Sequence, residues 1–116
     1  MNLNKLNAGL ESEKLAATYF VDKGLKLVAQ NYHCRFGEID LVMLDAATLV
    51  FVEVRLRTSH FFGDAAASIT PQKQRKIQLT AQHYLQQYSL LPACRFDVIL
   101  MNKPDVRSIT WLKNAF

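Results

Sequence analysis

The first stretch of the chain repeats apolar residues at helical spacing. From about Gly9 to Lys23, apolar positions recur four residues apart, as in Leu15 and Tyr19, and Gly24 stands where such a helix would end. A second helical pattern follows Thr70, a residue typical of helix N-caps, and Pro71, which suits the first helical position. Its apolar face consists of Ile77, Ala81, Tyr84, Leu85 and Tyr88. The pattern therefore predicts two amphipathic helices.

Five other segments show the looser alternation that is typical of strands. They are Leu25 to about Cys34, Glu38–Leu44, Leu49–Arg57, Cys94–Met101 and Val106–Lys113. The resulting order, αβββαββ, predicts an α/β fold in which helices pack on a mixed β-sheet. The chain has 116 residues and no Pro- or Gly-rich linker, so we expect a single domain over 1–116.

Composition narrows the class of protein. The 14 basic and 10 acidic residues give a formal net charge of +4, which permits a polyanionic partner. No segment approaches the roughly 18 apolar residues of a membrane span, so we expect a cytoplasmic protein without membrane contact. Cys34 and Cys94 lie far apart in sequence and are expected to be buried free thiols. No pair of Cys or His residues has zinc-site spacing.

Acidic residues gather on two neighbouring predicted strands. Glu38 and Asp40 share one face of the first strand, and Glu53 and Arg55 share one face of the second. A short turn at residues 45–48 would pair the strands so that Asp40 lies opposite Glu53 and Glu38 lies opposite Arg55. Two carboxylates would then face each other across the hairpin.

This arrangement has two interpretations. Two like charges about 5 Å apart repel by roughly 3 kcal/mol at an effective dielectric constant of about 20, and a divalent cation such as Mg²⁺ would relieve that repulsion. Alternatively the patch is a solvated face in which Glu38 pairs with Arg55, Glu53 leans toward Arg57, and Asp40 accepts hydrogen bonds from a turn. Spacing alone leaves both open.

Several ordered motifs resemble the bacterial YraN family. They are Gly37-Glu38-Ile39-Asp40-Leu41-Val42, Val50-Phe51-Val52-Glu53-Val54-Arg55-Leu56-Arg57, Phe62-Gly63 to Thr70-Pro71-Gln72-Lys73-Gln74, Cys94-Arg95-Phe96-Asp97-Val98 and the closing Asn114-Ala115-Phe116. Glu13 looks like the glutamate of that family's Gly-x-x-Gly-Glu pattern, with Ser12 in place of the second glycine. The resemblance covers nearly the whole chain.

The family is similar to archaeal Holliday junction resolvases, which implies a restriction-endonuclease-like fold with a PD-(D/E)xK site. By that resemblance Asp40 and Glu53 would bind Mg²⁺ or Mn²⁺ together with the Val54 carbonyl, and Glu13 would supply an acid from the first helix. Arg55 replaces the expected lysine; arginine can neutralise charge on a phosphate but cannot act as a base. At the start of the second helix, Lys73 is a candidate substitute cation.

The remaining candidates are mostly basic. We assign Arg57, Lys73, Arg75 and Lys76 to phosphate contacts beside the cleavage point, although a solvated basic face has the same composition. Phe61 and Phe62 either stack on nucleic acid or pack beneath a loop. We assign Glu38 to positioning the neighbouring site residues.

The leading hypothesis is a divalent-metal-dependent nuclease that cleaves DNA, with branched DNA as a candidate substrate. A non-catalytic nucleic-acid-binding module with the same fold is the alternative, and a structural or protein-interaction domain is a third. Junction resolvases act as dimers, so a homodimer is an option by analogy alone.

Overall fold

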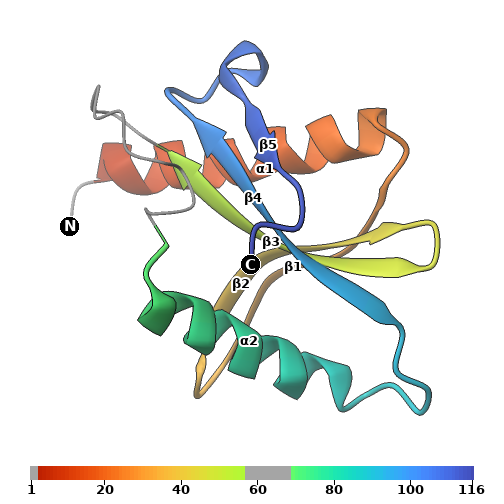
Figure 1. Ribbon diagram of the computed structural model, residues 1–116. Coiled ribbons are helices and arrows are strands. Elements are labelled where there is room, and N and C mark those ends of the chain that lie inside the picture. Colours follow the sequence, from red (N-terminus) through yellow and green to blue (C-terminus); the bar gives the residue numbers. More distant parts are fainter. Residues whose placement is uncertain (1–2, 57–68) are drawn as a thin grey trace.

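The computed structural model describes residues 3–56 and 69–116, and it has the predicted order of elements (Figure 1). The helices and strands are α1 (Leu3–Asp22), β1 (Lys26–Cys34), β2 (Gly37–Asp45), β3 (Thr48–Leu56), α2 (Pro71–Leu85), β4 (Ala93–Met101), a short 3₁₀ helix (Val106–Ser108) and β5 (Thr110–Leu112). The predicted α/β class is confirmed.

The five strands form one mixed sheet in the spatial order β1-β2-β3-β4-β5. Neighbours pair antiparallel except β3 and β4, which run parallel and are connected through α2. A parallel pair needs such a crossover because the chain must return to the starting end of the sheet. This architecture is compatible with a restriction-endonuclease-like fold.

The two helices cover opposite faces of the sheet (Figure 1). One hydrophobic cluster joins α1 to the sheet and includes Ala16, Phe20, Leu41, Met43, Val50 and Val52. The other joins α2 to the sheet and includes Ile39, Val42, Phe51, Ile77, Ala81 and Tyr84. The strands alternate between the two clusters, as a sheet that is buried on both faces requires.

Helix α2 begins as the sequence predicts. Thr70 is the N-cap, and its side-chain oxygen accepts a hydrogen bond of 3.2 Å from the backbone N–H of Lys73. This bond satisfies one of the unpaired donors of the first turn. Lys73 therefore lies in the first turn of α2, from which its side chain reaches the central strand β3.

Three expectations need correction. Helix α1 begins at Leu3, earlier than the apolar repeat indicates. The predicted strand Val106–Lys113 is a 3₁₀ helix followed by a three-residue strand, because the Asp105 side chain caps the backbone at Arg107. Cys34 and Cys94 are free, but Cys94 is exposed and Cys34 only half-buried, so the prediction of buried thiols was wrong.

No helix in the described part of the chain is long and apolar enough to cross a membrane.

The β1–β2 turn packs closely on α2, and Gly37 makes this contact possible. Gly37 has φ = +152°, and a Cβ at this position would lie 3.2 Å from Thr80 Oγ1. Side chains rarely adopt this backbone conformation. We expect Gly37→Ala to lower the free energy of unfolding by about 1–3 kcal/mol, measured by urea denaturation.

Gly9 provides the matched control. It lies in α1, and a Cβ there would meet no atom within 4 Å. Alanine favours helix over glycine by about 0.5–1 kcal/mol, so Gly9→Ala should raise stability slightly. Equal effects of the two substitutions would contradict the assigned role of Gly37.

Candidate active site

The β2–β3 hairpin has the predicted register. Leu41 pairs with Val52, and the pairing continues to Asp45 with Thr48, which leaves a two-residue turn. The paired region ends at Leu41 and Val52. Asp40 and Glu53 occupy the next position on each strand, where the backbone pairing has stopped.

Asp40 bridges the gap where the two strands separate. Its Oδ2 accepts a hydrogen bond of 2.8 Å from the backbone N–H of Val54 on β3. The regular alternation of faces also breaks here, since Ile39 packs in the α2 cluster and Leu41 in the α1 cluster. The Asp40 carboxyl thus takes the place of a backbone acceptor and is held between the strands.

Helix α1 contributes the third acid. Glu13 hydrogen-bonds through its side chain with Asp40 and with Asn31. In the β1–β2 register Asn31 lies opposite Asp40, between the pairs Gln30–Leu41 and Tyr32–Ile39. The predicted convergence of a helix acid on the sheet acids is therefore present.

Sequence analysis missed Asn31. Its φ of 51° is unusual within a strand, and asparagine tolerates this left-handed conformation better than most residues. An asparagine in the middle of an otherwise strand-like run is the signal that could have indicated it, because asparagine is depleted in strands.

Glu53 faces the other helix. It is only 8% exposed, and its Oε1 lies 3.1 Å from Lys73 Nζ and 3.5 Å from Arg55 Nε. Glu53 thus lies beside both Arg55 and Lys73, the two cationic side chains that the sequence suggested in place of the lysine expected from the family. The crossover that contains α2 places Lys73 beside a strand residue 20 positions earlier.

The pKa values of Asp40 and Glu13 are both raised in this site. Burial, followed by the negative charge of Glu53, raises the pKa of Asp40 from 3.8 to about 8 despite the hydrogen bond from Val54. Burial also raises the pKa of Glu13, while its hydrogen bonds with Asp40 and Asn31 oppose that rise. The directions fit a pair in which Asp40 holds the proton and donates it to Glu13. The site therefore keeps one of its acids neutral at a pH where an exposed aspartate is ionised.

Arg55 has an unused donor. Its Nε is buried and, among the described residues, has no hydrogen-bond acceptor, since the 3.5 Å contact with Glu53 is an ion pair only. The predicted pair between Glu38 and Arg55 is not among the ion pairs of residues 3–56 and 69–116. Glu38 instead lies with Lys76 around a surface hollow, and its charge raises the pKa of Asp40 and Glu13.

The basic residues that the sequence assigned to nucleic-acid contacts differ in their surroundings. Lys73 contacts Glu53, whereas Arg75 and Lys76 are exposed on α2. Arg57 lies outside the described residues, as do Phe61 and Phe62.

The site offers few protein ligands to a cation. Among the described residues, no group of three His, Cys, Asp or Glu side chains is arranged to hold a metal ion. Magnesium, however, is usually bound by one or two carboxylates together with water and substrate phosphate, rather than by a complete protein cage. Asp40 and Glu53 supply two carboxylates at facing positions of β2 and β3, and such all-oxygen donors suit Mg²⁺ or Mn²⁺ better than zinc.

A family model described as Uncharacterised protein family UPF0102 matches residues 12–101. The chain belongs to this family. UPF0102 is the YraN family, so the resemblance carried by the sequence motifs is confirmed. The matched residues include Glu13, Asp40, Glu53, Arg55 and Lys73.

Individual UPF0102 relatives match over almost the full chain. The UPF0102 protein of Methylobacillus flagellatus is 53% identical over 108 residues, which are 93% of this chain and 95% of the relative. The relative from Nitrosospira multiformis is 51% identical over 93% of this chain and 91% of its own. That from Psychromonas ingrahamii is 52% identical over 93% and 88%.

Proposed function

We propose that this UPF0102 protein is a divalent-metal-dependent nuclease that hydrolyses phosphodiester bonds in DNA. The observation that carries the proposal is the convergence of three acids: Asp40 Oδ2 is held by a 2.8 Å hydrogen bond from the β3 backbone, Glu13 hydrogen-bonds with it from α1, and Glu53 occupies the facing position on β3. Burial and the charge of Glu53 also raise the pKa of Asp40 to about 8. Perturbed carboxyls of this kind are concentrated at functional sites. A cation between Asp40 and Glu53 would offset that charge.

The residues have distinct roles in this proposal. Asp40 and Glu53 would hold the cation, and Glu13 would fix the position of the Asp40 carboxyl through their hydrogen bond. When bound, such a cation lowers the pKa of water and neutralises charge on the phosphate. Water then adds to phosphorus as the bond to the leaving oxygen breaks, and a proton from that water ends on the leaving oxygen.

Arg55 and Lys73 act on the phosphate in this scheme. The Arg55 side chain is about a third exposed, and the outer nitrogens of its guanidinium would donate to a phosphate oxygen. Lys73 neutralises Glu53 in the metal-free protein and would turn to the phosphate once a cation has replaced it. Arginine stays protonated and cannot act as the base, so the activation of water is the chemistry that a bound cation would supply.

The test is cleavage of supercoiled DNA and of a four-way junction in Mg²⁺ or Mn²⁺. We expect Asp40→Asn and Glu53→Gln each to reduce the rate by about 100-fold or more, and Glu13→Gln to reduce it by a smaller factor. Glu11→Gln is the matched control, because Glu11 is an exposed acid two residues from Glu13 on α1. Full activity in both the Asp40 and Glu53 variants would refute the proposal.

One observation favours the second candidate, a nucleic-acid-binding module without turnover. Lys73 and Arg55 already surround Glu53, so its charge is neutralised without a metal. Salt-sensitive DNA binding, with no cleavage under any metal condition, would support this candidate over the nuclease.

A further inference from the structure

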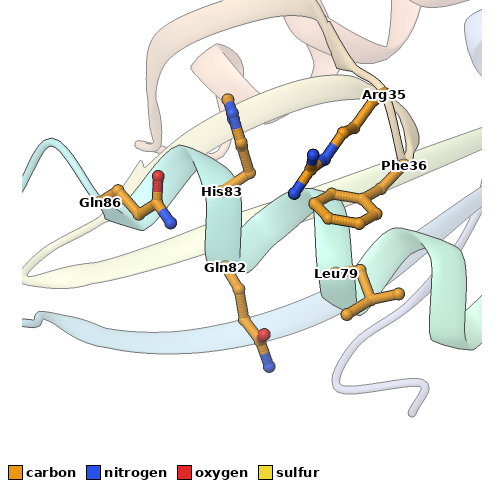
Figure 2. Close-up of a pocket in the computed structure, with 6 residues that line it drawn as sticks. All are labelled: Arg35, Phe36, Leu79, Gln82, His83 and Gln86. Carbon is orange, nitrogen blue, oxygen red and sulfur yellow. The ribbon is translucent and has the colours of Figure 1, made fainter.

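A second surface feature lies where the β1–β2 turn packs on α2, near the acidic residues of the candidate active site. Figure 2 shows Arg35 and Phe36 reaching from the turn toward Leu79 and His83 of the helix. These residues, with Gln82 and Gln86, line a hollow of about 450 Å³. A second hollow of about 530 Å³ shares Arg35 and Phe36 and continues to Glu38 and Lys76. Both volumes fall within the range of small-ligand sites.

The shared wall is an aromatic ring with a cation on it. The Arg35 guanidinium lies 4.8 Å from the centroid of the half-buried Phe36 ring. Across the hollow, the edge of the His83 ring approaches Phe36 at a centroid distance of 6.5 Å. Aromatic faces next to arginine are the typical platform for unpaired nucleobases.

The platform is held in place by the packing beneath it. Tyr32 on β1 hydrogen-bonds to His83, and Gly37 allows the turn to contact Thr80. Phe36 and His83 are thus positioned before any ligand binds, which lowers the entropy cost of binding, and only the exposed Arg35 side chain over the ring must turn aside.

The hollows also adjoin the candidate active site. Phe36 precedes Asp40 by four residues, about 13 Å along an extended strand. On the helix, Lys76 follows Lys73 by one turn. A strand of nucleic acid with a phosphate at the acids would therefore bring a base about four stacked nucleotides away to Phe36, at about 3.4 Å per nucleotide.

From these contacts we infer that the Phe36 platform binds an unpaired nucleotide of the substrate, with its base on Phe36 and its phosphate between Arg35 and Lys76. In a duplex the faces of each base are covered by its neighbours, so only an unpaired base can enter the hollow. This inference rests on the proposed function for its ligand class. It adds that the preferred substrate has a single-stranded segment next to the cleavage point.

Binding without cleavage tests the inference. The probes are a duplex of about 20 base pairs, the same duplex with a single-stranded extension of about six nucleotides, and that extension with abasic sites in place of its bases. Affinity is measured by fluorescence anisotropy in EDTA, so that no metal contributes. We expect the bases of the extension to strengthen binding of the unchanged protein by about 5- to 150-fold.

Variants of Phe36 and Arg35 test which side chains are responsible for the preference for bases. Phe36→Leu keeps an apolar side chain but removes the ring, and it should lose the preference for bases over abasic sites; Phe36→Tyr should retain it. Arg35→Ala should weaken binding to all extended probes and reduce the salt dependence by about 0.7 in log–log slope. The controls are Leu91→Ala, in the exposed connection after α2, and Lys103→Ala, in the β4–β5 connection away from α2 (Figure 1).

The outcomes separate this inference from the nuclease proposal. An unchanged base preference in Phe36→Leu, or no preference in the unchanged protein, would overturn the platform even if Asp40-dependent cleavage is observed. Conversely, a Phe36-dependent preference without metal-dependent cleavage would retain the platform and reject the nuclease.

Discussion

Without divalent cations at pH 8, Asp40→Asn is expected to be more stable than the unchanged protein by about 3 kcal/mol. The pKa of Asp40 rises from 3.8 to about 8 on folding because the carboxyl is buried beside Glu53. Each tenfold change in proton affinity is worth about 1.4 kcal/mol, so even two such steps amount to about 3 kcal/mol. Asparagine carries no charge and still offers Val54 N–H an acceptor.

The direction of the pH dependence follows from the raised pKa. Below about pH 4 the Asp40 carboxyl is protonated in both the folded and the unfolded protein and has no effect on stability. Between about pH 4 and 8 the folded protein keeps a proton that the unfolded chain releases, so stability falls as the pH rises. Urea denaturation at pH 5 and pH 8 should show this decline in the unchanged protein and a much weaker one in Asp40→Asn.

Asp40→Asn also tests whether Mg²⁺ binds at this site. If Mg²⁺ binds Asp40 and Glu53, it must displace the proton, so it should raise the melting temperature more at pH 8 than at pH 5. Asp40→Asn should lose most of that increase, whereas the control Glu11→Gln should keep it. A decline of stability with pH that is equally steep in Asp40→Asn would contradict the electrostatic strain at the site.

Asp97→Ala is expected to lower the free energy of unfolding by about 3–5 kcal/mol. The Asp97 side chain is fully buried and accepts hydrogen bonds from Arg95 Nε, Trp111 Nε1 and the backbone N–H of Asn114. Its removal would leave three donors without their acceptor, namely Arg95 Nε, Trp111 Nε1 and the Asn114 N–H, although Arg95 would keep its ion pair with Asp45. The network joins β4 to β5 and to the end of the chain, so its loss should loosen that edge of the sheet.

Chemical denaturation of Asp97→Ala checks this prediction, with Asp105→Asn as the control. Asp105 also pairs with an arginine two residues away, but Arg107 is almost fully exposed and asparagine can still cap the 3₁₀ helix. The control should therefore change stability far less. Similar losses in the two variants would mean that the Asp97 network is no more important than a surface ion pair.

Local patterns in the sequence predicted most of the fold and the register of the acidic hairpin. The alternation in β2 and β3 and the short turn between them require Leu41 to pair with Val52, as observed. Thr70 and Pro71 predicted the start of α2. In each case the signal depends on residues close together in the chain, so periodicity is sufficient. The strand predicted at Val106–Lys113 failed because a side-chain cap competed with a weak alternation.

The amino-acid sequence by itself determined which strands carry the acids and that Asp40 and Glu53 occupy neighbouring positions. Only the tertiary structure decided that Glu13 hydrogen-bonds with Asp40 and Asn31, that Lys73 pairs with Glu53, and that Phe36 lies against α2. These contacts depend on how each helix crosses the sheet and on where β2 and β3 separate. Helix and strand periods specify which side of an element is buried, but the distance between two elements is set by the packing of the whole core.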